Sequence, residues 1–155
     1  MTTKANASDL DAKANKSDVL LKKSASGGYY IEENSNELGS KAFAANNICI
    51  ASGNFSFAEG YSKATSTISH AEGGYAIASG YASHAEGSYT VASGTSSHAE
   101  GDHTQADQPG AHAEGYYTLA KTVASHAEGY YTVSNGNNSH AEGNSTKASG
   151  FCAHA

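Results

Sequence analysis

The tetrapeptide His-Ala-Glu-Gly recurs six times in this chain, at a constant spacing of fourteen residues. A fixed period this short indicates a stacked architecture, in which each repeat contacts only its neighbours. It also argues against a single active site, because every copy carries the same residues. The repeated polar positions are His70, His84, His98, His112, His126 and His140, together with Glu72, Glu86, Glu100, Glu114, Glu128 and Glu142.

The composition indicates a narrow interior. Glycine, alanine and serine are abundant, tryptophan is absent, and Pro109 is the only proline. A globular core needs bulky aliphatic side chains to offset the conformational entropy of the chain, and this chain has few of them. We therefore expect the all-β class, with a parallel β-roll, or solenoid, of fourteen-residue coils.

Charge and cysteine content exclude several classes of protein. The net charge is −6 at pH 7 and arginine is absent, so we expect no nucleic-acid partner. No apolar run is long enough to cross a bilayer, and the first residues lack an apolar signal region, which predicts no membrane insertion and synthesis in the cytoplasm. Cys49 and Cys152 are too few for a disulfide framework, and we expect both in packed positions.

The chain divides into three zones. Residues 1–26 are predicted to form an N-terminal attachment or stalk segment, helical or extended, with a flexible leader as the alternative. Residues 27–41 are predicted to cap the roll with a short strand and a turn. The repeat domain spans 42–155 and opens with two degenerate coils, of which the second, 56–68, is one residue short. The heptad-like positions of the first zone are Ala7, Leu10, Ala14, Ser17, Leu21 and Ser24.

Each repeat has room for two short strands and two turns. In the first strand, Ser-His-Ala-Glu, alternation places His and Glu outside and Ala inside. Glycine then permits a turn, and in the second strand, Tyr-Thr-Val-Ala, tyrosine and valine face outward. The copy at 97–110 departs from this pattern and predicts a local irregularity. The expected interior residues are Ala71, Ala85, Thr90, Ala92, Ala99, Thr104, Ala113, Thr118, Ala127, Thr132, Ala141 and Thr146.

The outward histidines and glutamates predict a polar seam between subunits. Coils stack about 4.8 Å apart, so a column of ionised glutamates would repel itself if it stood alone. An imidazole can donate to a carboxylate, and a protonated one neutralises it. We therefore expect each histidine to meet a glutamate of a neighbouring chain, in an assembly that weakens on acidification.

At these residues the chain resembles a known family. A small-x-Ala-x-Gly strand followed by a Thr/Ser-x-Ala strand is similar to the head repeats of trimeric autotransporter adhesins of the YadA type. The His-Ala-Glu-Gly version resembles the variant in bacteriophage tail-fibre and appendage proteins. Over 42–155 the resemblance implies a left-handed parallel β-roll that forms a homotrimer. The family usually carries valine and isoleucine where this chain has histidine and glutamate, which favours a hydrogen-bonded seam over a hydrophobic one.

The repeat also offers residues that could contact three other ligands: metal ions, ice and sugars. Imidazole and carboxylate suit Zn²⁺ or Fe²⁺, but cations one coil apart would repel, so we expect no metal and no cofactor. A threonine series could present a flat array to ice, yet the alternation places it inside. Outward rings could stack on sugars, although the pattern favours rings that cover the roll or pack between subunits. The candidate glycan contacts are Tyr75, Tyr89, Tyr117 and Tyr131.

We therefore expect a non-enzymatic structural fibre segment of a bacteriophage virion, in a tail fibre or appendage that attaches to the host surface. The alternative is the head of a bacterial cell-surface trimeric adhesin. No catalytic residue is expected, because the adjacent serine and histidine of each repeat face opposite sides of a strand. The expected partners are two further copies of the chain, other tail or baseplate proteins bound through residues 1–26, and host cell-wall glycan.

Overall fold

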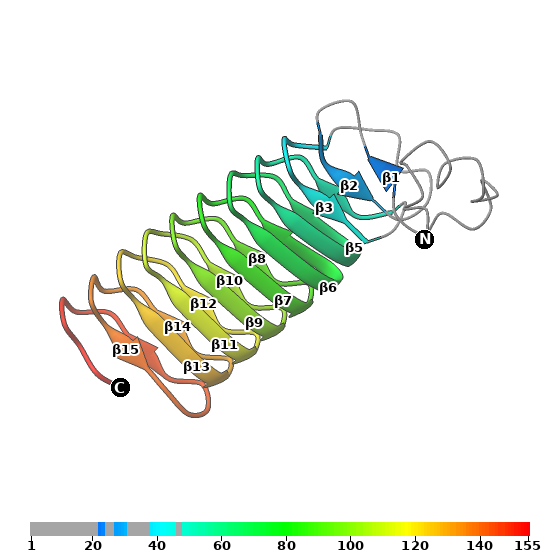
Figure 1. Cartoon of the computed structure of the whole chain (residues 1–155). Helices are drawn as coiled ribbons and strands as arrows, with labels where there is room; N and C mark the ends of the chain where they lie inside the picture. Colours follow the sequence, from blue (N-terminus) through cyan, green and yellow to red (C-terminus); the bar gives the residue numbers. More distant parts are fainter. Residues whose placement is uncertain (1–21, 24–26, 31–37, 46–47) are drawn as a thin grey trace, which may run out of the picture.

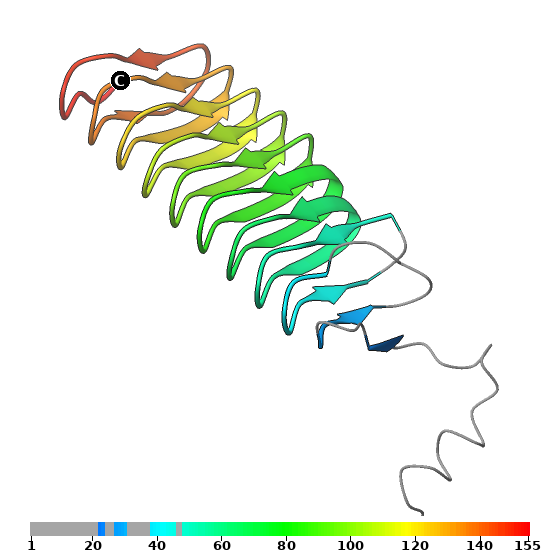
Figure 2. The ribbon, with the colours of Figure 1, turned by 90° about the horizontal axis from the view of Figure 1, so that it is seen from above.

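The computed structural model describes residues 22–23, 27–30, 38–45 and 48–155. These residues form a parallel β-solenoid with coils of about fourteen residues and contain no helix (Figure 1). Seen from above, the coils follow one another along a single axis (Figure 2). The expected all-β solenoid is therefore confirmed. The heptad-like positions of residues 1–26 lie outside the described residues.

Two rows of strands run along the solenoid, one on each side (Figure 1). Strands β5 (Phe57–Ala64) and β6 (His70–Ala78) contribute to both rows. The first row continues with β3 (Phe43–Ala44), β7 (His84–Ser88), β9 (His98–Asp102), β11 (His112–Tyr116), β13 (His126–Tyr130) and β15 (His140–Ala141). The second row contains β4 (Ile50–Ala51), β8 (Val91–Ala92), β10 (Gln105–Ala106), β12 (Leu119–Ala120), β14 (Val133–Ser134) and β16 (Lys147–Ala148).

At the N-terminal end, the sheet begins with a short antiparallel pair. Strand β1 (Lys22–Lys23) pairs antiparallel with β2 (Tyr29–Tyr30), and β2 pairs in parallel with β3. The sequence interpretation placed a short strand in this capping region, and β2 lies there. Within the described part of the chain, no helix is long and apolar enough to cross a membrane.

Each repeated residue pairs with its equivalent in the next coil. Strand β7 aligns His84 with His98 and Glu86 with Glu100, and the amide of His84 donates to the carbonyl of Ser97 at 3.0 Å. The same arrangement recurs along the repeats, so every side chain is stacked on the residue one coil away. This self-stacking determines which residue types each position can hold.

The register is interrupted where the chain is one residue short. Between β5 and β6, the pairing shifts between Tyr61 and Lys63, so a local irregularity absorbs the deletion in the coil 56–68. The irregularity expected at 97–110 is absent, because Gln105 pairs in register with both Val91 and Leu119. That expectation was wrong: changes of side chain preserve the register, and a change of length does not.

The interior is filled by alanine and threonine. The first-strand alanines Ala71, Ala85, Ala99, Ala113, Ala127 and Ala141 have no exposed surface, and Thr90, Ala92, Thr104, Thr118 and Thr132 are at most 1% exposed. The structure thus places these residues inside the roll. Thr146, in the last complete repeat, differs because it is only partly buried. Small side chains allow the two rows of strands to approach closely, which explains the scarcity of large aliphatic residues.

The turns lie elsewhere than the alternation predicted. Strand β7 continues through Gly87 to Ser88, and the chain turns at Tyr89, whose φ of 54° is left-handed. Consequently β8 contains two residues only, and the tyrosine belongs to a corner rather than to a strand. A left-handed residue other than glycine costs about 1–2 kcal/mol. The stacked coils offset that cost, since the amide of Tyr89 donates to the carbonyl of Gly74 at 2.8 Å.

The glycine of each His-Ala-Glu-Gly copy is required by the backbone and by its neighbour. Gly73 has a φ of 104°, and a Cβ built on it would lie 2.3 Å from the carbonyl oxygen of Gly87 in the next coil. The adjacent Gly74 has neither constraint, because a Cβ there would meet nothing within 4 Å. The backbone geometry of the repeat therefore requires glycine at the last position of His-Ala-Glu-Gly and places no such requirement on the residue that follows.

We predict opposite tolerance at these two adjacent glycines. Gly73→Ala should lower the free energy of unfolding by at least about 2 kcal/mol, because it combines a strained φ with a backbone clash. Gly74→Ala, the matched control, should change it by less than about 0.5 kcal/mol. Denaturant unfolding at one protein concentration measures both. Equal effects of the two substitutions on the free energy of unfolding would contradict the conclusion that only Gly73 is required by the backbone.

A second prediction concerns the interior threonines, whose buried hydroxyls at Thr90, Thr104, Thr118 and Thr132 have no hydrogen-bond partner. Thr118→Val removes an unsatisfied polar atom at nearly constant volume and should raise the free energy of unfolding by about 1–2 kcal/mol. Thr146→Val is the control, because the Thr146 hydroxyl donates to the carbonyl of Glu142 at 2.8 Å. The control should be destabilised, and stabilisation of both variants would refute the explanation.

Candidate functional site: the His–Glu ladder

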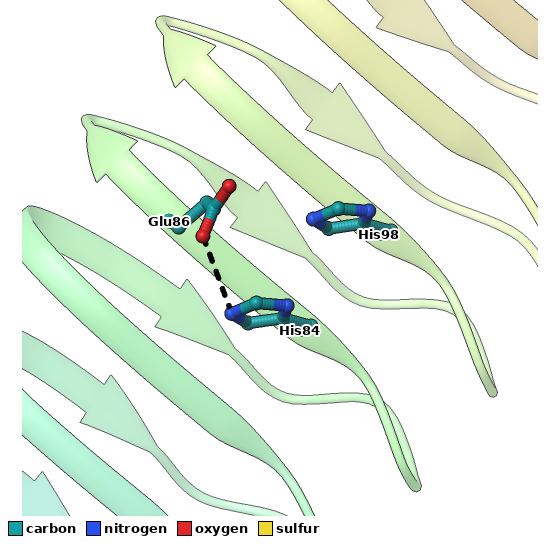
Figure 3. Close-up of side chains that lie close together, drawn as sticks. All are labelled: His84, Glu86 and His98. Atoms are coloured by element: carbon teal, nitrogen blue, oxygen red, sulfur yellow. Dashed lines mark ion pairs between the residues drawn. The ribbon is translucent and has the colours of Figure 1, made fainter.

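The outward histidines and glutamates of the first strand row form one continuous array, here called the His–Glu ladder. Two residues apart on a strand, the histidine and glutamate of each copy project from the same face. In five successive coils, from His70 to Glu128, the imidazole Nε2 lies 3.5–3.7 Å from a carboxylate oxygen of the same coil (Figure 3). The members are His70, Glu72, His84, Glu86, His98, Glu100, His112, Glu114, His126, Glu128, His140, Glu142 and His154.

The imidazole rings stack on one another along the solenoid. From His70 to His140, successive ring centroids lie 4.5–4.9 Å apart, with interplanar angles of 1–17°. Towards the N-terminus, Phe57 meets His70 edge-to-face at 4.8 Å with an interplanar angle of 88°, and Phe43 stacks on Phe57 at 5.0 Å. Phenylalanine at the histidine position of the two degenerate coils was the sequence signal for this stacking, and the sequence interpretation did not use it.

The ladder is partly shielded from solvent. From His70 to Glu128, both types of side chain are 33–38% exposed. The Nε2 atoms themselves are buried and have no hydrogen-bond partner in His70, His84, His98, His112, His126 and His140. The histidine–glutamate distances exceed those of ordinary hydrogen bonds. The ladder therefore presents a row of buried nitrogen atoms for which the described part of the chain supplies no hydrogen-bond donor.

Burial and neighbouring histidines lower the pKa of two ladder histidines, His84 and His112. The pKa of His84 is lowered from its usual value, first by burial, then by His70 and His98, while Glu86 acts in the opposite direction. The pKa of His112 is lowered in the same way, again with burial as the largest cause. A neutral imidazole with its proton on Nδ1 exposes a lone pair on Nε2, which can accept a hydrogen bond or bind a metal.

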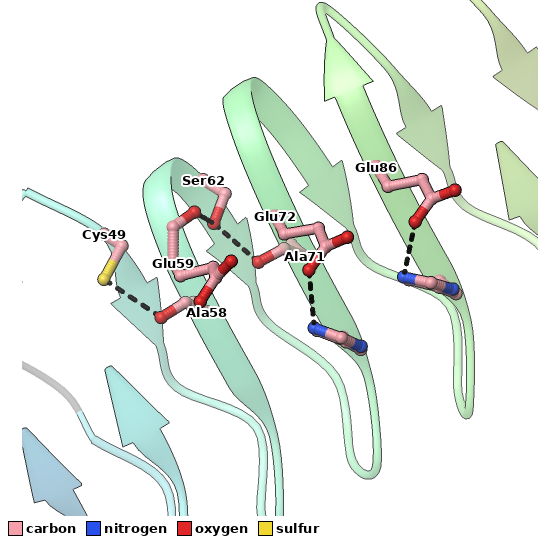
Figure 4. Close-up of polar contacts among 9 residues, drawn as sticks. Cys49, Ala58, Glu59, Ser62, Ala71, Glu72 and Glu86 are labelled. Carbon is pink, nitrogen blue, oxygen red and sulfur yellow. Dashed lines mark hydrogen bonds and ion pairs between the residues drawn. The ribbon is translucent and has the colours of Figure 1, made fainter. Parts of the chain in front are cut away.

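At the N-terminal end, the ladder has a different supporting network. Glu59 occupies the glutamate position, but its partner position holds Phe57 (Figure 4). Beneath them, the Ser62 hydroxyl donates to the carbonyls of Glu59 and Ala71 at 2.7 and 2.8 Å, and the Cys49 thiol donates to the carbonyl of Ala58 at 3.2 Å. These contacts anchor the first coils of the roll.

Of the two cysteines, only one occupies a packed position. Cys49 is buried, which agrees with the expectation of a packed position. Cys152 is exposed, so the expectation that both are packed was wrong. Cys152 has a φ of 54° at the second corner of its coil, and a residue at that corner projects away from the interior.

The candidate glycan contacts lie in a second stacked column. Tyr75, Tyr89, Tyr117 and Tyr131, with His103 between the second and third, have successive centroids 4.4–5.0 Å apart. Their interplanar angles of 6–22° mean that the ring faces cover one another. Ring edges and hydroxyl groups remain for solvent, so a sugar at this surface would meet hydrogen-bonding groups rather than an open aromatic face.

The serine that precedes each histidine is directed away from it. The Ser83 hydroxyl is buried and donates to the carbonyl of Gly80 at 2.8 Å, and Ser97 does the same with Gly94. The imidazoles project from the outer face, so adjacent serine and histidine do not form a nucleophile and base pair. The ladder's chemistry is that of imidazole and carboxylate alone.

Comparisons with protein-family models, with curated proteins and with solved structures give no match to this chain. The chemistry of the ladder is therefore argued from its own geometry.

The lowered histidine pKa values predict acid sensitivity. The folded state binds fewer protons than the unfolded state, so this contribution to stability is present above about pH 6.5 and is lost as the pH falls through the folded pKa. His112→Phe should make the fall in stability between neutral and acid pH shallower, while Phe57 shows that the column accepts phenylalanine. Denaturant unfolding against pH, in chelator-treated buffer, measures the slope.

The reverse substitution provides the control. Phe57→His lengthens the histidine column by one ring and should make the same slope steeper. Slopes that do not differ among the two variants and the original protein would show that the stacked histidines do not control the acid response.

Proposed function

We propose that this chain is a non-enzymatic structural segment of a bacteriophage virion, part of a tail fibre or appendage that serves attachment to the host surface. In this proposal, three copies of a left-handed roll lie side by side as a homotrimer. The roll extends the fibre and holds the part that recognises the host. The alternative is the head of a bacterial cell-surface trimeric adhesin.

One observation carries the proposal: residues at equivalent positions of the repeat pair with one another through successive coils. His84 pairs with His98, which pairs with His112, and the second row repeats the arrangement from Val91 to Gln105. Such a structure grows in one direction only, since each coil contacts its two neighbours. A chain built this way supplies length and stiffness rather than a cavity for a substrate, which suits a spacer in a fibre.

The unpartnered Nε2 atoms support the trimeric part of the proposal. A buried polar atom without a hydrogen-bond partner costs about 1–3 kcal/mol, and the ladder repeats this atom in successive coils. Donors of neighbouring chains would satisfy these atoms, and the partly exposed glutamates would meet partners along the same seam. The resemblance to trimeric adhesin heads, with polar residues in the interface positions, favours this hydrogen-bonded seam.

The adhesin alternative depends on the same roll and the same resemblance. It differs in where the protein is found and what it is attached to. In the fibre proposal, residues 1–26 dock on other tail or baseplate proteins, and host cell-wall glycan is the surface met by the fibre. In the adhesin proposal, the roll is carried outside a bacterial cell.

The oligomeric state is the first test. Light scattering at neutral pH should give a mass of three chains of 15.8 kDa each. Replacing Glu100 and Glu114 by lysine should dissociate the trimer, because the new ammonium groups lie on the seam. The control places lysine at Ser79 and Ser93, exposed positions equivalent to Lys121, and should leave the trimer intact.

A monomeric wild-type protein would overturn the trimer. If the protein stays trimeric in both lysine variants, the interface between the chains does not lie on the His–Glu ladder.

Immuno-electron microscopy distinguishes the two functions. Antibodies raised against the recombinant chain should label the tails of phage particles released from the source culture. Label on the surface of intact bacterial cells, with none on particles, would instead establish the adhesin alternative.

A further inference from the structure

We propose that the His–Glu ladder binds divalent transition-metal ions such as Zn²⁺, with one ion held by two histidines of adjacent coils and the glutamate between them. Five such groups are formed by side chains of the described residues, and in each the three ligand atoms lie within 4.8 Å of one another. They are His84–Glu86–His98, His98–Glu100–His112, His112–Glu114–His126, His126–Glu128–His140 and His140–Glu142–His154.

The distances are close to those of a bound ion. Around tetrahedral zinc, ligand bonds of about 2.0–2.1 Å place neighbouring ligand atoms roughly 3.4 Å apart. The His84 Nε2 and a Glu86 carboxylate oxygen are already 3.7 Å apart (Figure 3). The two imidazoles stack with centroids 4.8 Å apart and an interplanar angle of 1°, so both rings must tilt to bring their Nε2 edges together around one ion. Three protein ligands then leave one position for water.

The nitrogen atoms are prepared for this role. In every ladder histidine except His154, Nε2 is buried and makes no hydrogen bond to the residues that the structure describes, so binding an ion breaks no hydrogen bond there. Imidazole together with carboxylate suits zinc, nickel and copper better than magnesium or calcium.

Shared ligands limit how many ions the ladder holds. Adjacent groups have one histidine in common, and a single Nε2 lone pair cannot bind two ions. Only every second group can therefore be filled, with His84/His98, His112/His126 and His140/His154 as the full set. Ions two coils apart are separated by about 9.6 Å, twice the strand spacing. The spacing reduces the repulsion that argued against an ion in every coil, and each glutamate offsets part of the added charge.

Metal binding does not depend on the fibre function, but it uses the same Nε2 atoms that the proposed trimer seam would use. Every ligand of a site comes from one chain, so a monomer offers complete sites, whereas in a trimer the ion would replace a donor of the neighbouring chain. Light scattering in chelator, performed on the same preparation, therefore reports on the trimer separately from the metal.

The test is titration of the full chain, without a histidine tag and stripped by chelator, with Zn²⁺ at neutral pH in a calorimeter. Three ions per chain are expected. Co²⁺ provides a second probe, because its visible absorption should show the intensity of four-coordinate sites. Absence of binding, or more than three ions per chain in the ladder, would overturn the proposal.

Two variants with equal numbers of histidines separate paired sites from adventitious binding. The alternating variant replaces His84, His112 and His140 by phenylalanine, which removes every adjacent pair. The block variant replaces His126, His140 and His154, and retains the group His84–Glu86–His98. Phe43 and Phe57, which stack in the same column, show that phenylalanine fits there, and circular dichroism checks the fold of each variant.

The alternating variant should weaken Zn²⁺ binding by more than about tenfold, a loss that even outer-shell changes can cause at metal sites. The block variant should still bind at least one ion with the original affinity. Equal binding by the two variants would show that isolated histidines account for the binding and would refute the paired sites.

Discussion

The structure depends on the parallel hydrogen bonding between successive coils. It holds equivalent residues about 4.8 Å apart, so each side chain must tolerate a copy of itself above and below. Alanine does so inside the roll, where Ala71 and Ala85 pair directly. Imidazole and phenol rings do so outside, because flat rings stack at that separation. Glycine is needed where the backbone of one coil approaches the carbonyl of the next, as at Gly73.

The same constraint creates the chemistry of the His–Glu ladder. Stacking places one imidazole nitrogen per coil in a row, partly buries it, and leaves it without a donor, as His84 and His98 illustrate. At His84, burial and the neighbouring histidines lower the pKa, while the glutamates act in the opposite direction. A seam with other chains and a series of metal ions are two ways to supply what these nitrogens lack. They are distinguishable because one needs further copies of the chain and the other does not.

Local pattern predicted much of this arrangement and failed at the corners. Alternation placed Ala85 and Thr90 on the inside because side chains of a strand change face at every residue. It placed the turn at Gly87, whereas the chain turns at Tyr89, a residue type that seldom adopts a left-handed φ. The deciding contact is the hydrogen bond from the amide of Tyr89 to the carbonyl of Gly74, which belongs to the preceding coil. A local sequence pattern does not predict a hydrogen bond between two coils.

The sequence by itself determined the all-β solenoid, its period and the face of the strand on which histidine and glutamate lie, because these follow from a fixed repeat and from strand alternation. Only the tertiary structure decided that the imidazoles stack, that their Nε2 atoms are buried, and that from His70 to His126 each lies 3.5–3.7 Å from a glutamate of its own coil. These features arise from the register between coils and from side-chain packing around it. Residues fourteen apart become neighbours there, and a linear pattern does not record the geometry with which they meet.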